Sequence, residues 1–205
     1  MNFKDKIEKL EIELEQEEYI FKTGDVPVML TAVHTMEQTK ENGETKLSEP
    51  YTKAIAKYVS ENVNSFYFIK VKDTKIDSNS LVLDEFKKRL LHYIKDNNIK
   101  LVIDLHGASI ERDFDVEFGT LNNLSADFST IKELEDAFEE VGVKNIEYNN
   151  PFKGGGITQF IFDQTDIDVI QIEINRKYRD LSNSEDIEKI CNALINFIKQ
   201  YNSCE

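Results

Sequence analysis

Two of the three histidines in the chain follow directly on short apolar segments. His34 ends the apolar run of residues 26–33, and His106 ends the run that begins at Leu101. The third, His92, lies in an amphipathic segment, where we expect a helix-surface residue without a function. Neutral imidazole is the commonest protein ligand for zinc, and a catalytic zinc often has two histidine ligands and one glutamate. The two strand-end histidines therefore predict a site for one Zn²⁺ per chain that lacks only the carboxylate.

Two glutamates are candidates for this carboxylate. Glu37 lies three residues after His34, a spacing that lets both side chains converge where the chain turns off a strand. Glu49 opens a segment with helical periodicity, so its carboxylate could point back across a loop toward His34. The alternatives are a solvated loop charge for Glu37 and an acid that complements the helix dipole for Glu49. The residues alone leave both metal-ligand candidates open.

Two further carboxylates lie within apolar strand segments. Glu173 interrupts the apolar run 168–175, and a buried, unpaired carboxylate there would be costly or protonated. A carboxylate beside the water that zinc activates is the usual general base of zinc hydrolysis, so we expect Glu173 to be catalytic. Asp104 lies two residues before His106 and therefore on the same strand face. We expect it to accept the imidazole N–H of His106 and fix its tautomer, with a purely structural hydrogen bond as the alternative.

Two arginines and a run of three glycines are candidates for binding the substrate. Arg112 closely follows the second strand-end histidine and could stabilise the oxyanion that forms at a polarised carbonyl. Arg176, beside Asn175, could bind a substrate carboxylate through two parallel hydrogen bonds. Gly155 and Gly156 belong to a triplet whose backbone N–H groups could surround an anion in a flexible loop on the substrate side. For either arginine, pairing with a surface carboxylate is the alternative.

The elements that must position these residues alternate between strands and helices. We predict strands at residues 26–33, 65–71, 100–107, 113–120 and 168–175, and helices at 49–63, 83–98, 131–142 and 184–201. This alternation predicts an α/β fold with a mixed, largely parallel sheet. In such sheets ligands bind at the carboxyl ends of the strands, where the candidate residues lie. With no repeat or linker, residues 1–205 are expected to form one domain.

The amino-acid composition makes some classes of binding partner unfavourable. The chain of 205 residues has 25 Lys and Arg against 39 Asp and Glu, a net charge of −14. This balance disfavours nucleic acids and anionic membranes, because phosphate binding needs clustered cations. No apolar run approaches the ~18 residues of a membrane span, and the charged N-terminus lacks the apolar stretch of a secretory signal. We therefore expect a cytoplasmic protein, whose oligomeric state the residues do not indicate.

Six segments together resemble the N-formylglutamate amidohydrolase family, a relative of the zinc carboxypeptidases. They are AVH (32–34), EPYT (49–52), IDLHG (103–107), RDFD (112–115), GGGITQF (154–160) and IQIEINRKYRD (170–180). The resemblance implies a three-layer, carboxypeptidase-like (phosphorylase/hydrolase-like) α/β fold. It also implies one zinc held by His34, a glutamate and His106, with Glu173 as the base. The acid before the P-Y-T helix favours Glu49 as second ligand, whereas the HxxE pattern of carboxypeptidases would select Glu37.

The expected function is that of a zinc amidohydrolase. Its substrate would be a small acidic N-acyl amino acid, such as N-formylglutamate, whose C–N amide bond is cleaved. Two alternatives stay open: a non-catalytic ligand-binding domain of the same fold, and a peptidase or poly-γ-glutamyl hydrolase that uses the same site.

Overall fold

A mixed sheet forms the centre of the protein. The structure, a computed structural model, describes residues 1–40 and 42–204, and within these it has one seven-stranded sheet in the order β1-β5-β2-β6-β9-β7-β8. The strands are β1 (Tyr19–Lys22), β2 (Val26–Ala32), β5 (Ser65–Lys70), β6 (Leu101–Ala108), β7 (Val116–Gly119), β8 (Ile146–Tyr148) and β9 (Asp168–Asn175). Of the neighbouring pairs, β1–β5 and β7–β9 are antiparallel and the others are parallel. A separate hairpin pairs β3 (Gln38–Thr39) with β4 (Thr45–Lys46).

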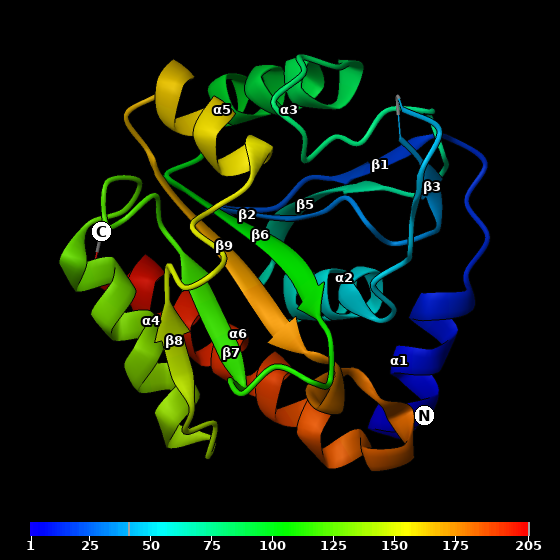
Figure 1. Cartoon of the computed structure of the whole chain (residues 1–205). Helices are drawn as coiled ribbons and strands as arrows, with labels where there is room; N and C mark the ends of the chain where they lie inside the picture. Colours follow the sequence, from blue (N-terminus) through cyan, green and yellow to red (C-terminus); the bar gives the residue numbers. More distant parts are fainter. Residues whose placement is uncertain (41, 205) are drawn as a thin grey trace.

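Helices cover both faces of the sheet (Figure 1). One face is covered by α1 (Phe3–Ile12), α2 (Thr52–Val63), α4 (Phe128–Glu140) and α6 (Ser184–Cys204), and the other by α3 (Glu85–Asp96) and α5 (Gly156–Gln164). Two 3₁₀ turns, η1 (Arg176–Arg179) and η2 (Leu181–Asn183), link β9 to α6. The prediction of a three-layer α/β fold with a mixed, largely parallel sheet is confirmed.

The central strands are apolar on both faces because helices bury both. In β6, Ile103 packs into the cluster under α2 and α6, while Val102 packs into the cluster under α3 and α5. Strands buried on both sides read as continuous apolar runs, which is why β2, β6 and β9 were visible in the sequence. On the α3/α5 face, the residues toward the carboxyl ends of these strands change from apolar to polar. They are Thr31, Asp104, His106, Gln171 and Glu173.

Several boundaries differ from the prediction for local reasons. Helix α2 begins at Thr52 rather than at residue 49, because the preceding Tyr51 has a φ of 70° and is not helical. The strand predicted at 113–120 is only Val116–Gly119. The glycine triplet leads directly into a helix, α5, that was not predicted. Among the described residues, no helix is long and apolar enough to cross a membrane.

Candidate metal centre and active site

Two histidines and one glutamate meet at the carboxyl end of the central strands. The Nδ1 atoms of His34 and His106 lie 3.1 Å apart. The Glu49 carboxylate spans both rings, with Oε1 3.0 Å from Nδ1 of His34 and Oε2 3.1 Å from Nδ1 of His106. All three side chains are buried, and one ligand atom from each lies within 4.8 Å of the others. These three residues could hold a metal ion.

Sheet register and one loop bring the three residues together. His34 follows β2 and His106 lies in β6, and these two strands are parallel neighbours in the sheet. The loop after β2 forms the β3–β4 hairpin and returns, so that the Glu49 N–H donates to the carbonyl of His34 at 2.7 Å. The Gly107 N–H then donates to Glu49 Oε2 at 2.9 Å. These two hydrogen bonds attach the backbone of Glu49 to His34 and its carboxylate to Gly107, at the ends of β2 and β6.

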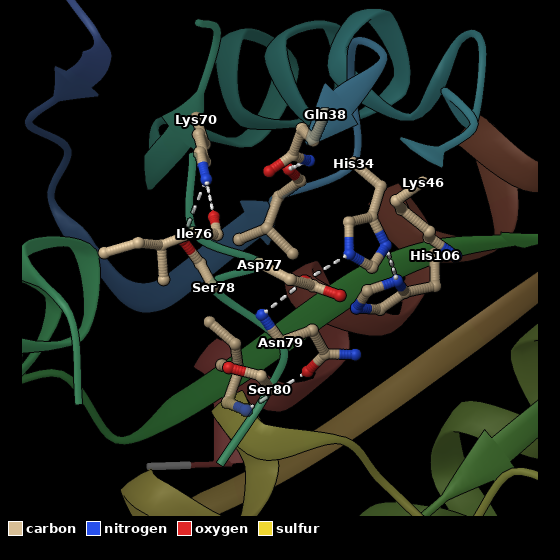
Figure 2. Close-up of polar contacts among 12 residues, drawn as sticks. His34, Gln38, Lys46, Lys70, Ile76, Asp77, Ser78, Asn79, Ser80 and His106 are labelled. Atoms are coloured by element: carbon tan, nitrogen blue, oxygen red, sulfur yellow. Dashed lines mark hydrogen bonds and ion pairs between the residues drawn. The ribbon is translucent and has the colours of Figure 1, made fainter. Parts of the chain in front are cut away.

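An aspartate accepts from the outer nitrogen of each imidazole. Asp77 Oδ1 lies 2.8 Å from Nε2 of His34, as Figure 2 shows, and Asp104 Oδ2 lies 3.0 Å from Nε2 of His106. An ionised carboxylate only accepts, so each Nε2 carries the hydrogen and each Nδ1 turns a lone pair inward. Two lone pairs and a carboxylate that face one another repel unless a cation lies between them. The donor set therefore fits a zinc ion, which takes imidazole and carboxylate ligands.

Protonation of His106 provides such a positive charge when no metal is bound. Burial lowers the pKa of His106, but the carboxylates of Asp104 and Glu49 outweigh burial and raise the pKa well above its ordinary value. The Asp104 carboxylate is fixed on its other side by the Thr31 hydroxyl, which donates to Oδ1 at 2.6 Å. Asp104 thus contacts His106 as expected from their spacing.

Glu173 lies beside this group on the next strand. It pairs with His106 in the β6–β9 register, and only 6% of its surface is exposed. Its Oε1 accepts from Nε2 of Gln171 at 2.9 Å. Burial raises the pKa of Glu173 to about 7. A carboxyl group with such a pKa can both accept and return a proton near neutral pH.

The candidate metal ligands and Glu173 open into one cavity of about 420 Å³. The residues that line it include His34, Glu49, Asp77, His106, Gln171 and Glu173, the cations Lys40, Lys46, Arg112 and Lys153, and the backbone of residues 151–155. Arg112 is exposed, and its guanidinium lies 5.0 Å from the centre of the Phe152 ring. Its predicted contact with an oxyanion stays a prediction. Gly155 lines the cavity as the residue that precedes α5.

Glu37 lies apart from the three candidate metal ligands, which corrects one of the two predicted carboxylates. It is exposed and absent from the His34, Glu49 and His106 group among the described residues. The three-residue spacing between His34 and Glu37 did not bring their side chains together, because the chain enters the β3–β4 hairpin after His34. There Gln38, rather than Glu37, turns back and donates to the carbonyl of Val33 at 2.6 Å.

Three predicted substrate-binding residues also lie elsewhere. Asn175 is buried, and its Nδ2 donates to the carbonyls of Arg112 and Phe114, so it anchors the segment that carries Arg112. Arg176 is exposed, and neither it nor Asn175 is among the described residues that line the cavity. The Gly156 N–H donates to the Asn79 carbonyl at 2.9 Å and is thus already used within the protein. These positions do not support direct contact between the three residues and a substrate in this cavity.

Two residues that the sequence analysis missed support the site. Asp77 lies in an irregular segment after β5, where no periodicity indicates its direction. Arg179 is buried in η1, and its guanidinium donates to the carbonyls of Ile174, Pro50 and Ala108 at 2.7–3.0 Å. These carbonyls lie next to Glu173, next to Glu49 and two residues after His106. The guanidinium therefore connects the three segments that carry the candidate catalytic groups.

The fold and the site together define a three-layer α/β protein with a candidate metal centre at the carboxyl ends of its central strands. The sequence profile of the N-formylglutamate amidohydrolase family matches residues 84–178, which confirms the resemblance predicted from the sequence. A comparison with curated proteins finds no match.

Three of the solved structures that are similar to the chain illustrate its fold. An N-formylglutamate amidohydrolase from Ralstonia eutropha JMP134 shares 12% identity at a TM-score of 0.63, over 89% of this chain and 97% of that one. A bacteriophage poly-gamma-glutamate hydrolase shares 12% identity at 0.62, over 94% of both chains. A metallo-carboxypeptidase from Burkholderia cenocepacia shares 10% identity at 0.51, over 85% of this chain and 57% of that one. At these identities the similarity shows the carboxypeptidase-like fold alone.

Proposed function

We propose that the protein, as one domain of residues 1–205, is a zinc-dependent amidohydrolase. Its substrate is a small acidic N-acyl amino acid, such as N-formylglutamate, and it cleaves the C–N amide bond. The observation that carries this proposal is the inward-facing pair of imidazole nitrogens at 3.1 Å with Glu49 across them, beside the buried Glu173. The family profile over residues 84–178 supports the amide substrate.

His34, Glu49 and His106 would hold the zinc ion. When bound, zinc would polarise the amide carbonyl and lower the pKa of a water molecule toward ~7. Asp77 and Asp104 accept hydrogen bonds from Nε2 of the two imidazoles and orient the rings, so that the two Nδ1 atoms face the centre and would bind the metal.

Glu173 moves the proton. Its carboxylate accepts a proton from the attacking water and then delivers it to the nitrogen of the leaving amine. A pKa of about 7 suits both directions of transfer at neutral pH. Gln171, which donates to Glu173 Oε1, holds the carboxylate in place against the strand.

The acidic substrate class rests on charge. The chain has a net charge of −14, yet arginine and lysine side chains gather around this cavity. Arg112, at the exposed side, is suited to bind an anionic group of the substrate through its guanidinium. The backbone of Gly155 lines the same cavity and is available for contact with the substrate.

The test measures metal content and hydrolysis in one preparation. Protein purified without chelator is expected to contain one zinc per chain and to release formate from N-formyl-L-glutamate. α-linked and γ-linked glutamyl dipeptides, assayed in parallel, separate a peptidase or a poly-γ-glutamyl hydrolase from the proposed activity. Folded protein that binds no zinc and cleaves none of these amides would instead indicate a non-catalytic binding domain.

A further inference from the structure

Lys46 is the cation that lies nearest to the candidate metal ligands among the ion pairs of the described residues. Its Nζ is 2.8 Å from Oε1 of Glu49, the same oxygen that lies 3.0 Å from Nδ1 of His34. Its side chain is 32% exposed and lines the cavity. Figure 2 shows Lys46 beside the two imidazoles. The ammonium group therefore lies beside the candidate metal ligands, within the cavity.

The fold fixes this lysine in place. Lys46 pairs with Gln38 in the β3–β4 hairpin, and the buried Gln38 side chain donates to the carbonyl of Val33. At the other end of the hairpin segment, the Glu49 N–H donates to the carbonyl of His34. Both ends of the segment are thus attached to the residues around His34, and the position of Lys46 follows from the backbone rather than from its flexible side chain alone.

Metal binding would change the electrostatic effect of the contact between Lys46 and Glu49. A divalent cation held by Glu49 would share the single negative charge of this carboxylate, and the ammonium, 2.8 Å from Oε1, would then lie close to that cation. Two like charges at short range repel unless an anion lies between them. A cation kept in this place by the fold is consequently unfavourable for metal binding and favourable for binding an anion beside the metal.

We propose that Lys46 binds the carbonyl oxygen of the substrate amide as this oxygen becomes negatively charged. The inference rests on the proposed function. Water adds to the amide carbon, the π electrons of the C=O bond move onto the oxygen, and Glu173 takes the proton of the water. When the electrons return, the C–N bond breaks and Glu173 protonates the amine. Lys46 holds the oxygen throughout. This contact replaces the oxyanion contact expected of Arg112, which is exposed and is left to bind the outer anionic group of the substrate.

The test compares Lys46→Met with Lys132→Met. Lys132 lies on α4 and is not among the described residues that line the cavity, and its ammonium pairs with Glu135 at 2.9 Å and with Asp136 at 2.8 Å. In Lys46→Met we expect kcat on N-formyl-L-glutamate to fall by ~10²–10³-fold, the usual loss for one oxyanion-binding group. KM should change less than about threefold, and Lys46→Arg should recover part of kcat. Lys132→Met should change kcat by less than about threefold.

Zinc affinity is the second readout and does not require turnover. Because a repelling charge is removed, Lys46→Met should bind zinc as tightly as the parent or several-fold more tightly in competition with a chelator. Loss of zinc from Lys46→Met would show that the lysine supports the metal ligands, which overturns the proposal. An unchanged kcat, or a raised KM with unchanged kcat, would overturn it as well.

Inorganic phosphate separates this inference from the proposed function. The zinc-loaded parent should bind phosphate about tenfold more tightly than zinc-loaded Lys46→Met, whereas Lys132→Met should match the parent. This arm is decisive even if the parent cleaves no amide, a result that would reject the proposed function alone. Equal phosphate affinity of the parent and Lys46→Met would reject an anion-binding Lys46.

Discussion

The protonation of His106 links pH to metal binding. In the metal-free protein, burial lowers the pKa of His106, but the carboxylates of Asp104 and Glu49 outweigh burial and raise this pKa well above the ordinary value, which favours the protonated imidazole. A metal can bind Nδ1 only after that proton leaves. Apparent zinc affinity should therefore be full above the raised pKa and should fall as the pH drops through it.

Calorimetry measures this proton directly. Zinc titrated at neutral pH into buffers of different ionisation enthalpy should show release of about one proton per zinc. Asp104→Asn removes the carboxylate that raises the pKa, and it should release a smaller fraction of a proton at the same pH. Zinc binding without any proton release in the parent would contradict the inferred state of His106.

The substitution Glu173→Gln should distinguish the catalytic role of Glu173 from that of the candidate metal ligands. Glu173→Gln retains size and can accept hydrogen bonds, but it cannot take a proton. We expect it to keep zinc and fold while kcat falls by ~10²–10⁴-fold, the usual contribution of general acid–base catalysis. Glu49→Gln and His106→Ala should instead lose zinc, as measured by metal analysis after gel filtration.

Glu37→Gln is the matched control for the glutamate variants. Glu37 is exposed and outside the group of candidate ligands, so zinc content and kcat should equal those of the parent. Loss of zinc from Glu37→Gln with retention in Glu49→Gln would reverse the assignment of the carboxylate ligand.

At the scale of elements, the sequence predicts the site residues that lie on strands but not those that lie in loops. His106 and Glu173 could be predicted because each interrupts an apolar run that helices bury on both faces. Glu49 could not be distinguished from Glu37 by spacing, since the choice depends on how the hairpin after His34 returns. Asp77 has no periodic signal at all, because its direction is set by tertiary contacts of an irregular segment.

Arg179 gives the sharpest example of an element that sequence reasoning overlooked. It ends η1 and bonds three carbonyls from separate segments, so only the assembled fold reveals its place. The space beside it is filled, since a Cβ added at Gly107 would lie 2.3 Å from its Cζ. This guanidinium accordingly fixes the relative positions of the strand ends.

Removing Arg179 should therefore affect both stability and the metal. Arg179→Met leaves buried carbonyls without donors, each at a cost of roughly 1–3 kcal/mol, and we expect a loss of about 3 kcal/mol in the free energy of unfolding in urea. Zinc affinity of the folded variant should also fall. Arg89→Met, which removes an exposed arginine paired with Glu85, should change stability by less than ~1 kcal/mol. Equal stability of Arg179→Met and the parent would contradict a connecting function.

At the scale of the whole molecule, the metal group joins segments that are distant in the chain. His34 follows β2, Glu49 precedes α2 and His106 lies in β6, so these donors are brought together only in the folded chain. The fold class followed from the alternation of apolar and amphipathic segments, whereas this convergence depended on the strand order and on the returning hairpin. A ligand that binds the folded state alone stabilises it by mass action.

Zinc should for this reason stabilise the entire protein. At a free zinc concentration of ~100 times Kd, the free energy of unfolding should rise by about 2.7 kcal/mol, and a chelator should remove this gain. Urea unfolding of the parent with zinc, and with chelator, measures the difference. Glu173→Gln should show the same gain as the parent because its ligands are intact, and His106→Ala should show little. An equal gain in His106→Ala would mean that zinc binds elsewhere, and the metal centre proposed at the ends of β2 and β6 would be wrong.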